Sequence, residues 1–580
     1  MNLARHTALF SALSRRALLL CAAALLLASL GVAALAQETY RKPSKEVLDI
    51  LNAPVTPVAS VSPARDVLIL ATGVRYPPIA DLAQPMLRLA GLRINPNTNG
   101  PHRAGYFVAL TLKRIADGAE TKIELPPGAQ AGAPLWSYDG KHFAFTNTTP
   151  AGVELWAGDS QTGRVQKLKG VAVNAVYGAP VQWMPGGRAL LVRTIVANRK
   201  PLSPAPNVPR EPVIQESAGR AGPVRTYQDL LKNQYDEEQF TYYATAQLAL
   251  VDAMSGKVTP VGQPAVFETV DAAPDGQHLL VSRIQRPYSY LYPASDFPKE
   301  VEVWDAKGKL VHKLASLPLQ DQVPIDGVQT GPRGHTWRPT EPATLVWAEA
   351  LDNGDPKKKV PHRDRVLMLK APFTSSPVEL TKTEHRYTGV RWGEKDGAYM
   401  VSDYDRNRRW TTTRMLSADN PADAGKMIFS RSVQDRYNDP GTPITKVLPT
   451  GGRVVIQDGD NIYLTGAGAS PAGDQPFLDR FNVRTAQAER LFHSQPNAYE
   501  YVVTILEEYG RSFLTSRETP AAPPNYFLRT RVPAPIGHDA AGRPIQSDVK
   551  YLETAKPLTN FPDPTPQLRA IKKQLVRYKL

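Results

Sequence analysis

Cysteine and the common catalytic motifs are the clearest absences from this chain. Its 580 residues include one cysteine, Cys21, and no Gly-x-Ser-x-Gly or His-Glu-x-x-His sequence. A single thiol forms neither an internal disulfide nor a thiolate metal site, and the absent motifs are those of serine hydrolases and zinc peptidases. The ten histidines are scattered, and most, such as His142 and His278, fall at predicted strand positions. The sequence therefore predicts no catalytic residue, no metal site and no cofactor.

Two short stretches begin like binding motifs and then depart from the pattern. Residues 403–407 start like a calcium loop, but Arg408 and Arg414 occupy the positions that need glycine and glutamate. Residues 466–468 supply two glycines, without the third glycine and the helix of a phosphate-binding loop. Neither stretch predicts a bound ion or nucleotide.

The charge balance is basic but not concentrated. Lysine and arginine outnumber aspartate and glutamate by 69 to 55, a formal net charge of +14, which favours acidic substrates or anionic surfaces. No dense basic run with interleaved aromatic residues occurs, so nucleic-acid binding is not predicted. The lysines at 357–359 follow a turn sequence and are interpreted as part of a solvated turn.

The first 36 residues predict an export signal. Arginines precede an apolar run at 17–30, and Ala34-Leu35-Ala36 is a small-x-small cleavage site. Cleavage there removes Cys21 and begins the mature chain at Gln37, in the periplasm or outside the cell, with no membrane association afterwards. A transmembrane anchor is the competing interpretation, and Arg15-Arg16 leaves twin-arginine and ordinary secretion both open.

Residues 134–168 give the clearest structural pattern, four short strands in succession. Asp139-Gly140 separates two apolar runs, which is the strongest short-range signal of a β-hairpin, and Thr162-Gly163 closes a second tight turn. Four strands too short to bury a face alone form one twisted sheet that must stack on neighbours. The pattern predicts a blade of a β-propeller.

Similar blade cores recur at uneven spacing along the chain. They predict an all-β fold, a propeller of seven or eight blades over residues 58–535, after a tether at 37–57 with a short helix within 40–51. Residues 82–92 are interpreted as an inserted helical piece. The eight cores begin at Val58, Pro134, Val181, Ala273, His335, Val390, Pro449 and Tyr501.

A long insertion at 197–245 interrupts the third predicted blade. It begins proline-rich and ends in a segment, 226–243, whose pattern predicts a helix. Ordered insertions of this length are more often functional than idle. We therefore expect a flap or a docking element here.

Arg406, Arg408, Arg409 and Trp410 form the one cluster for which the sequence suggests a binding role. If these side chains face the central channel, their guanidinium groups match the geometry of a substrate carboxylate. A solvated blade edge is the alternative interpretation. No other residues are predicted to bind substrate.

Several stretches resemble the glutamyl endopeptidase branch of the prolyl oligopeptidase family, which comprises secreted and plastid serine peptidases. Together they extend over nearly the whole of the chain after residue 36, and the set is quite specific. They include residues 76–82, 89–94, 225–233, 242–245, 435–441, 468–479 and 558–568.

The resemblance implies a propeller followed by an α/β-hydrolase domain with a Ser-Asp-His triad. Residues 571–578 resemble the first strand leading into such a domain. Residues 536–580 are therefore interpreted as a linker and the beginning of the hydrolase domain. A complete hydrolase domain needs roughly 200 further residues. We expect this stretch alone to be inactive in proteolysis, gating peptides or flexible protein tails toward a missing or separate hydrolase domain. The alternative is a free-standing, non-catalytic propeller that binds peptides or envelope partners.

Overall fold

The computed structural model describes residues 42–208, 225–395, 397–420, 425–507, 509–533, 551–571 and 576. The chain divides into two compact units, residues 1–53 and 54–580. In the first unit, helix α2 (Lys45–Leu51) carries Glu46 in its first turn, where a negative charge interacts favourably with the helix dipole. This helix agrees with the one predicted within 40–51, whereas the predicted signal at 1–36 lies outside the described residues.

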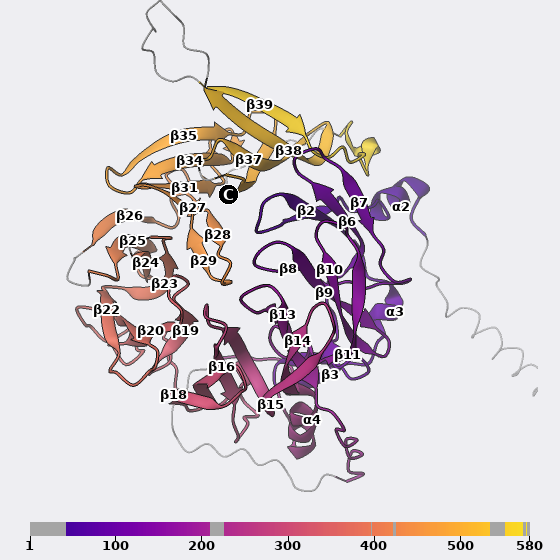
Figure 1. The fold of residues 1–580 in the computed structure, drawn as a ribbon, viewed down its shortest axis with the longest axis vertical. Helices are drawn as coiled ribbons and strands as arrows, with labels where there is room; N and C mark the ends of the chain where they lie inside the picture. The colour runs from indigo at the N-terminus through magenta and orange to yellow at the C-terminus, as the bar shows by residue number, and fades with distance from the viewer. Residues whose placement is uncertain are drawn as a thin grey trace, which may run out of the picture. The chain divides into compact units, whose positions relative to one another are not determined.

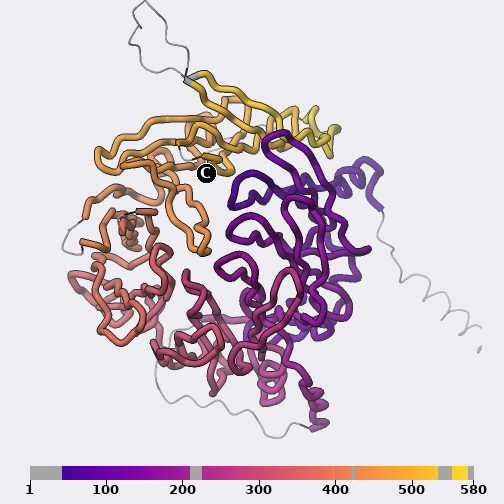
Figure 2. Tube along the Cα trace, viewed as in Figure 1, coloured from indigo at the N-terminus to yellow at the C-terminus, as the bar shows by residue number. Residues whose placement is uncertain are grey.

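The second unit is a β-propeller whose antiparallel sheets follow one another around a central space in chain order (Figure 1). Figure 2 shows the colours passing around this ring until the last strands lie beside the first. The first sheet contains β1 (Val58–Val61), β2 (Val67–Gly73), β6 (Phe107–Arg114) and β7 (Glu120–Ile123). The last contains β36 (Tyr499–Ile505), β37 (Ser512–Thr519), β38 (Ala522–Pro533) and β39 (Tyr551–Pro557).

Four further sheets of four or more strands lie between these two. The largest contains β8 (Leu135–Trp136), β9 (His142–Thr149), β10 (Gly152–Asp159), β11 (Val165–Val173), β12 (Val181–Trp183), β13 (Ala189–Ile195), β14 (Thr245–Asp252), β15 (Val258–Ala272), β16 (His278–Ile284), β17 (Lys299–Asp305) and β18 (Leu310–Leu317). Two four-stranded sheets follow, β19 (Arg333–Trp337), β20 (Thr344–Ala350), β21 (Asp364–Lys370) and β22 (Val378–Thr383), then β23 (Arg386–Trp392), β24 (Ala398–Asp405), β25 (Trp410–Ser417) and β26 (Lys426–Ser432). The fourth contains β27 (Thr442–Pro443), β30 (Gln457–Asp458), β31 (Asn461–Gly466), β34 (Phe477–Asn482) and β35 (Gln487–His493).

The propeller has six blades when its blades are counted as hydrogen-bonded sheets, so the prediction of seven or eight was wrong. Three of the predicted cores lie in one 11-stranded sheet, as the successive runs β8–β11, β12–β15 and β15–β18. The 15-residue strand β15 joins two of these runs because it pairs with β14 along one part and with β16 along another. The other junction is a single pairing between β11 and β13, at Val173 and Thr194.

The pattern at 134–168 is confirmed as four antiparallel strands, β8 to β11. Gly140 takes a φ of +73° at the first turn, a conformation that glycine adopts at no steric cost. Asp139 supports the turn, because its Oδ1 accepts a hydrogen bond from the Lys141 amide at 3.1 Å. The local signal therefore gave the correct strand order and turn position.

Side chains pack between neighbouring sheets to form the core. The ring closes where the first and last sheets meet, around Leu68, Leu514 and their apolar neighbours. One hydrogen bond is added at this junction, from the Ala59 amide to the Tyr526 hydroxyl oxygen at 2.9 Å.

The segment at 82–92, predicted as helical, is helical only at Leu82, and Leu87–Leu89 and Leu92 lie in two paired strands. A short helix, α3 (Ile79–Leu82), precedes a three-stranded sheet of β3 (Leu87–Leu89), β4 (Leu92–Asn95) and β5 (Gly100–Pro101). The β3–β4 turn packs closely against the chain at 293, since a Cβ on Gly91 would lie 2.8 Å from the Pro293 side chain. This tertiary contact outweighs the weak local helix pattern.

The insertion contains a helix, α4 (Gln234–Ala244), that is shorter than the predicted 226–243. It starts at Asn233, whose side chain accepts a hydrogen bond from the Asp236 amide and caps the helix. Phe240 is fully buried on the packed face of the helix. Residues 209–224 of the insertion lie outside the described residues.

The last sheet extends beyond the predicted propeller boundary at 535. Strand β39 pairs with β38 along its length, so residues 551–557 belong to the propeller rather than to a linker. Of the predicted first strand of a further domain at 571–578, only 571 and 576 are described. The remaining short elements are β32 (Ala469–Ser470), β33 (Gly473–Asp474) and the 3₁₀ helices η1 (Ala294–Asp296) and η2 (Pro566–Leu568).

Candidate central binding cavity

A cavity of about 700 Å³ lies at the centre of the propeller, where the innermost strands meet. Strands β1, β8, β12, β27, β31 and β36 line it, together with the two-stranded hairpin of β28 (Thr445–Val447) and β29 (Arg453–Val455). Its volume falls within the range of about 300–1,000 Å³ typical of ligand sites. The full lining is Ser60, Val61, Ser62, Pro63, Arg65, Pro134, Leu135, Trp136, Tyr138, Val181, Gln182, Trp183, Pro443, Ile444, Thr445, Lys446, Val447, Gly451, Arg453, Thr465, Val503 and Thr504.

Three aromatic side chains form one wall of the cavity and are held by hydrogen bonds. The Trp136 indole donates to Ser60 Oγ at 2.9 Å, and the Trp183 indole donates to the Leu135 carbonyl at 2.8 Å. The Tyr138 hydroxyl donates to the Trp183 carbonyl at 2.7 Å. Burial, with a smaller contribution from the charge of Asp271, raises the pKa of Tyr138 to about 12, so this donor stays protonated.

All of the charged residues that line the cavity are basic: Arg65, Lys446 and Arg453. Lys446 Nζ lies 2.8 Å from a carboxylate oxygen of Glu394, which holds it at the cavity wall. Arg453 donates to the Thr445 hydroxyl, with Nη2 at 3.1 Å. Guanidinium and ammonium groups facing a confined space attract carboxylates more strongly than they do in open water.

A second cavity, of about 440 Å³, adjoins the first and shares Pro63, Arg65, Lys446 and Val447 with it. It adds Glu507 to the lining, whose Oε1 accepts a hydrogen bond from the Ser512 amide at 3.1 Å. The Glu507 carboxylate is therefore already hydrogen-bonded to the backbone within its own turn. The shared residues place two of the three cations where the cavities meet.

Asp271 lies near Tyr138, on β15. The residue is exposed to solvent, yet crowding by protein atoms raises its pKa to about 6.

The arginine cluster singled out from the sequence does not line either cavity. It lies in the turn between β24 and β25, where Arg406 Nη2 is 2.9 Å from an Asp326 carboxylate oxygen and Arg408 lies over the Trp410 ring. The Trp410 indole donates to Ser430 on the outer strand β26. The cluster forms an exposed corner of its sheet, as the alternative interpretation held.

The remaining sequence candidates occupy structural positions. His142 stacks on Trp183, and His278 Nδ1 lies 2.7 Å from an Asp275 carboxylate oxygen within a turn. Asp403 accepts hydrogen bonds from the Thr412 hydroxyl and the His385 amide. Among the described residues, no group of three or more histidine, cysteine, aspartate or glutamate side chains is arranged to hold a metal ion.

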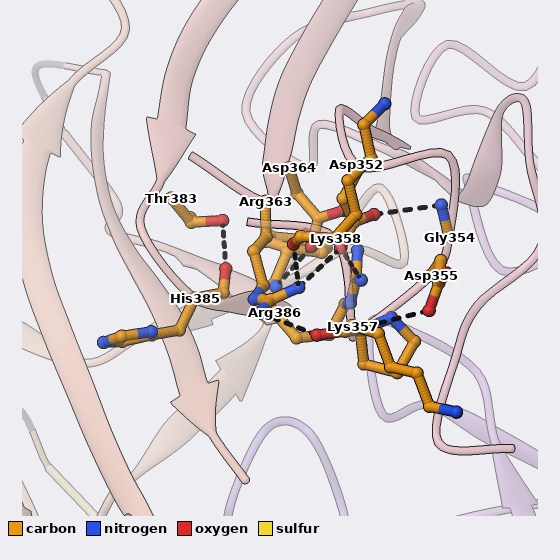
Figure 3. Close-up of polar contacts among 12 residues, drawn as sticks. Asp352, Gly354, Asp355, Lys357, Lys358, Arg363, Asp364, Thr383, His385 and Arg386 are labelled. Atoms are coloured by element: carbon orange, nitrogen blue, oxygen red, sulfur yellow. Dashed lines mark hydrogen bonds and ion pairs between the residues drawn. The ribbon is translucent and has the colours of Figure 1, made fainter. Parts of the chain in front are cut away.

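A buried ion network joins two neighbouring sheets and was missed by the sequence reasoning (Figure 3). The side chains of Asp352 and Asp364 are completely buried, and Arg386, from the next sheet, pairs with both. Arg363 pairs with Asp352 at 2.8 Å, and Arg333 with Asp364 at 2.7 Å. The Asn353-Gly354-Asp355-Pro356 turn was visible in the sequence, but the partners on other strands were not.

Fold and cavity together define this part of the chain as a β-propeller with a cation-lined central cavity. No family model matches the chain. The resemblance to glutamyl endopeptidases is confirmed by sequence: the chain is 34% identical over 573 residues to a protein named probable glutamyl endopeptidase, chloroplastic, from Oryza sativa subsp. japonica. The similarity spans 93% of this chain and 59% of that protein. A protein of the same name from Arabidopsis thaliana is also 34% identical, over 93% of this chain and 57% of its own length.

The chain thus spans somewhat more than half the length of these relatives.

Solved structures give weaker matches. Porphyromonas gingivalis dipeptidyl peptidase 4 matches 82% of this chain and 57% of its own with 10% identity and a TM-score of 0.42. The β-propeller domain of the Trilobed protease from Pyrococcus furiosus matches 75% of this chain and 99% of its own with 8% identity and a TM-score of 0.35. None of the helices among the described residues is long and apolar enough to cross a bilayer.

Proposed function

We propose that this chain is the substrate-gating propeller of a glutamyl-endopeptidase-like serine peptidase, and that its central cavity receives acidic peptide segments. The observation that carries the proposal is the charge of the cavity, whose lining contains three cations and no carboxylate. Relatives named glutamyl endopeptidases, 34% identical over 93% of the chain, support a peptidase role. The aromatic wall supplies apolar contact for the peptide beside the charged groups.

We further propose that the protein is exported and that the propeller, without a hydrolase domain, does not cleave peptides. The sequence contains no Gly-x-Ser-x-Gly motif, and hydrolysis is expected to need a Ser-Asp-His domain, present in cis or supplied in trans. We expect export with cleavage after Ala36. N-terminal sequencing of the protein from its native host is expected to begin at Gln37, and an intact Met1 would contradict export by a cleaved signal.

The test measures, by fluorescence anisotropy, the binding of a labelled peptide that contains glutamate and of an otherwise identical peptide that contains glutamine instead. The glutamate peptide is expected to bind more tightly, with an affinity that falls as salt is added, and neither peptide is expected to be cleaved. Arg453→Gln is expected to weaken binding of the glutamate peptide about tenfold, the loss for one charge-assisted hydrogen bond of about 1.5 kcal/mol. Arg436→Gln, which removes an exposed cation outside both cavities, is the matched control.

The alternative is a free-standing propeller that binds peptides or envelope partners without any role in proteolysis. It predicts equal affinity for the two peptides, or no change on adding a hydrolase domain of a glutamyl endopeptidase in trans. Equal binding of both peptides, together with an unaffected Arg453→Gln variant, would refute the acidic-substrate proposal.

A further inference from the structure

The hairpin of β28 and β29 carries two of the three cations that line the central cavity, and Figure 1 shows it pointing toward the middle of the ring. Lys446 of β28 lies opposite Val454 of β29, and Arg453 is the residue before Val454. Directly paired residues share a face of a sheet, and neighbours along a strand point to opposite faces. Lys446 and Arg453 therefore lie on opposite faces of the hairpin. Thr445, the residue before Lys446, shares the face of Arg453.

The face that carries Lys446 packs against the neighbouring sheet. Val454 is fully buried in a core that includes Trp392. The Lys446 ammonium lies 2.8 Å from a carboxylate oxygen of Glu394, and the Lys446 side chain is only 16% exposed. Its charge is therefore compensated by a carboxylate of the same chain. Arg65, the third cation of the lining, is also engaged by other groups of the protein.

Arg453, on the other face, is exposed and is bonded to a neutral group. Its Nε and Nη2 donate to the Thr445 hydroxyl oxygen at 3.3 and 3.1 Å. Within the part of the chain that the structure describes, no carboxylate forms an ion pair with Arg453. The positive charge of this guanidinium therefore stays available to a ligand in the cavity.

Two other arginines show what the same edge of a guanidinium does elsewhere in this chain. Arg283 donates through Nε and Nη2 to the Glu302 carboxylate, at 3.0 and 2.7 Å. Arg529 donates in the same way to Glu500, at 2.7 Å for both bonds. In Arg453 a hydroxyl oxygen accepts at this edge instead, so the guanidinium is held without being neutralised.

The second edge of the Arg453 guanidinium, formed by Nη1 and Nη2, presents two further parallel N–H donors. Such a pair matches the two oxygens of one carboxylate. A carboxylate offers an acceptor to both donors, whereas the amide of glutamine offers one oxygen and an NH₂ group that is itself a donor. This edge therefore discriminates between an acid and its amide.

We propose that Arg453 is the specificity-determining residue of the central cavity, that it binds one peptide carboxylate through Nη1 and Nη2, and that Thr445 is its positioning residue. This inference rests on the proposed function, since it names the group that is bound in the same cavity. The carboxylate belongs to an acidic side chain or to the free C-terminus of a peptide, which present the same planar anion.

The test measures the binding of three labelled peptides by fluorescence anisotropy. A glutamate peptide and a glutamine peptide both end in an amide, and a third peptide has glutamine and a free C-terminal carboxylate. Arg453→Lys keeps the positive charge but lacks the planar pair of donors. Thr445→Val removes the acceptor that holds Arg453, and Thr445→Ser keeps a hydroxyl there as the matched control. Thermal melting verifies that each variant is folded.

Arg453→Lys is expected to weaken binding of the peptide with a carboxylate about tenfold, because one charge-assisted hydrogen bond is lost. Thr445→Val is expected to weaken it about fivefold, since a long side chain must then be ordered on binding. Thr445→Ser is expected to restore most of the affinity lost in Thr445→Val. Binding of the fully amidated glutamine peptide is expected to stay the same, which a merely structural role of Thr445 would not predict.

The inference would be overturned if Arg453→Lys and Thr445→Val left the ratio of affinities for the carboxylate and amide peptides unchanged. If the glutamate peptide were still preferred in that case, the proposed function would stand, with its specificity set by other residues. A preference only for the free C-terminus that is lost in Arg453→Lys would support the carboxylate site and refute the binding of acidic segments. Equal affinity of the unmodified protein for all three peptides would refute both.

Discussion

Removing Arg386 is expected to destabilise the propeller strongly. The Arg386 guanidinium is the bridge between the two completely buried carboxylates, with Nη1 2.7 Å from Asp364 Oδ1 and Nη2 bonded to Asp352. In Arg386→Met each carboxylate retains one cation, Arg363 or Arg333. Removing one partner of a buried ion pair costs about 3–5 kcal/mol. Because each carboxylate keeps one arginine, we expect a loss in the free energy of unfolding at the lower end of this range, about 3 kcal/mol.

The measurement is urea unfolding at neutral pH, followed by tryptophan fluorescence. Arg365→Met is the matched control, because Arg365 pairs with Glu349 on the same sheet while remaining 41% exposed. Exposed pairs contribute only about 0–1 kcal/mol. Hydrogen exchange is expected to speed up across β21 and β23, the strands that carry Asp364 and Arg386. A loss of the same size in both variants would refute the argument that burial makes this network important.

Three further predictions concern the ring junction, Asp271 and the hairpin of β28 and β29. Tyr526→Phe is expected to cost about 1 kcal/mol, the net contribution of one hydrogen bond, and to speed amide exchange at Ala59; unchanged exchange there would contradict a role in ring closure. The pKa of Asp271 is about 6 in the folded chain, against an ordinary aspartate value of 3.8. The folded state therefore binds the proton more tightly than the unfolded state does. The free energy of unfolding is expected to fall as the pH rises between these two values. Asp271→Asn is expected to remove this part of the pH dependence, and parallel stability profiles of the two proteins would contradict it. Gly451→Ala is expected to destabilise the protein more than Gly459→Ala. Both glycines have positive φ, but only a Cβ on Gly451 would meet a side chain, the Tyr138 ring at 2.4 Å, so equal thermal shifts would contradict this close contact.

Local sequence signals predicted the repeated strands well, because each depends on residues that are close in the chain. Asp139-Gly140 marked a real hairpin turn, and the run of apolar residues after it, Phe143 to Phe145, formed a buried strand. The number of separate sheets was not predictable in this way. Val258 to Ala272 contains prolines and glycine that suggest a break, yet tertiary pairing keeps it one strand.

The site depended on contacts that no local pattern reveals. Arg65 is far in the sequence from Lys446 and Arg453, which lie on one hairpin, and each of the three alone resembles an ordinary surface residue. The sequence placed the start of a blade core at Pro449, whereas Thr445–Val447 and Arg453–Val455 form a separate two-stranded hairpin. Arg406 and its neighbours were conspicuous because they are adjacent in sequence, although adjacency on a turn favours exposure.

The central claim is that the cationic cavity of the propeller binds acidic peptide segments. The most direct test is titration of the purified chain with the glutamate peptide and its glutamine twin, with and without the Arg453→Gln substitution. The account predicts tighter binding of the glutamate peptide, and a loss of that preference in the variant. Indistinguishable affinities for both peptides in the unmodified protein would contradict it.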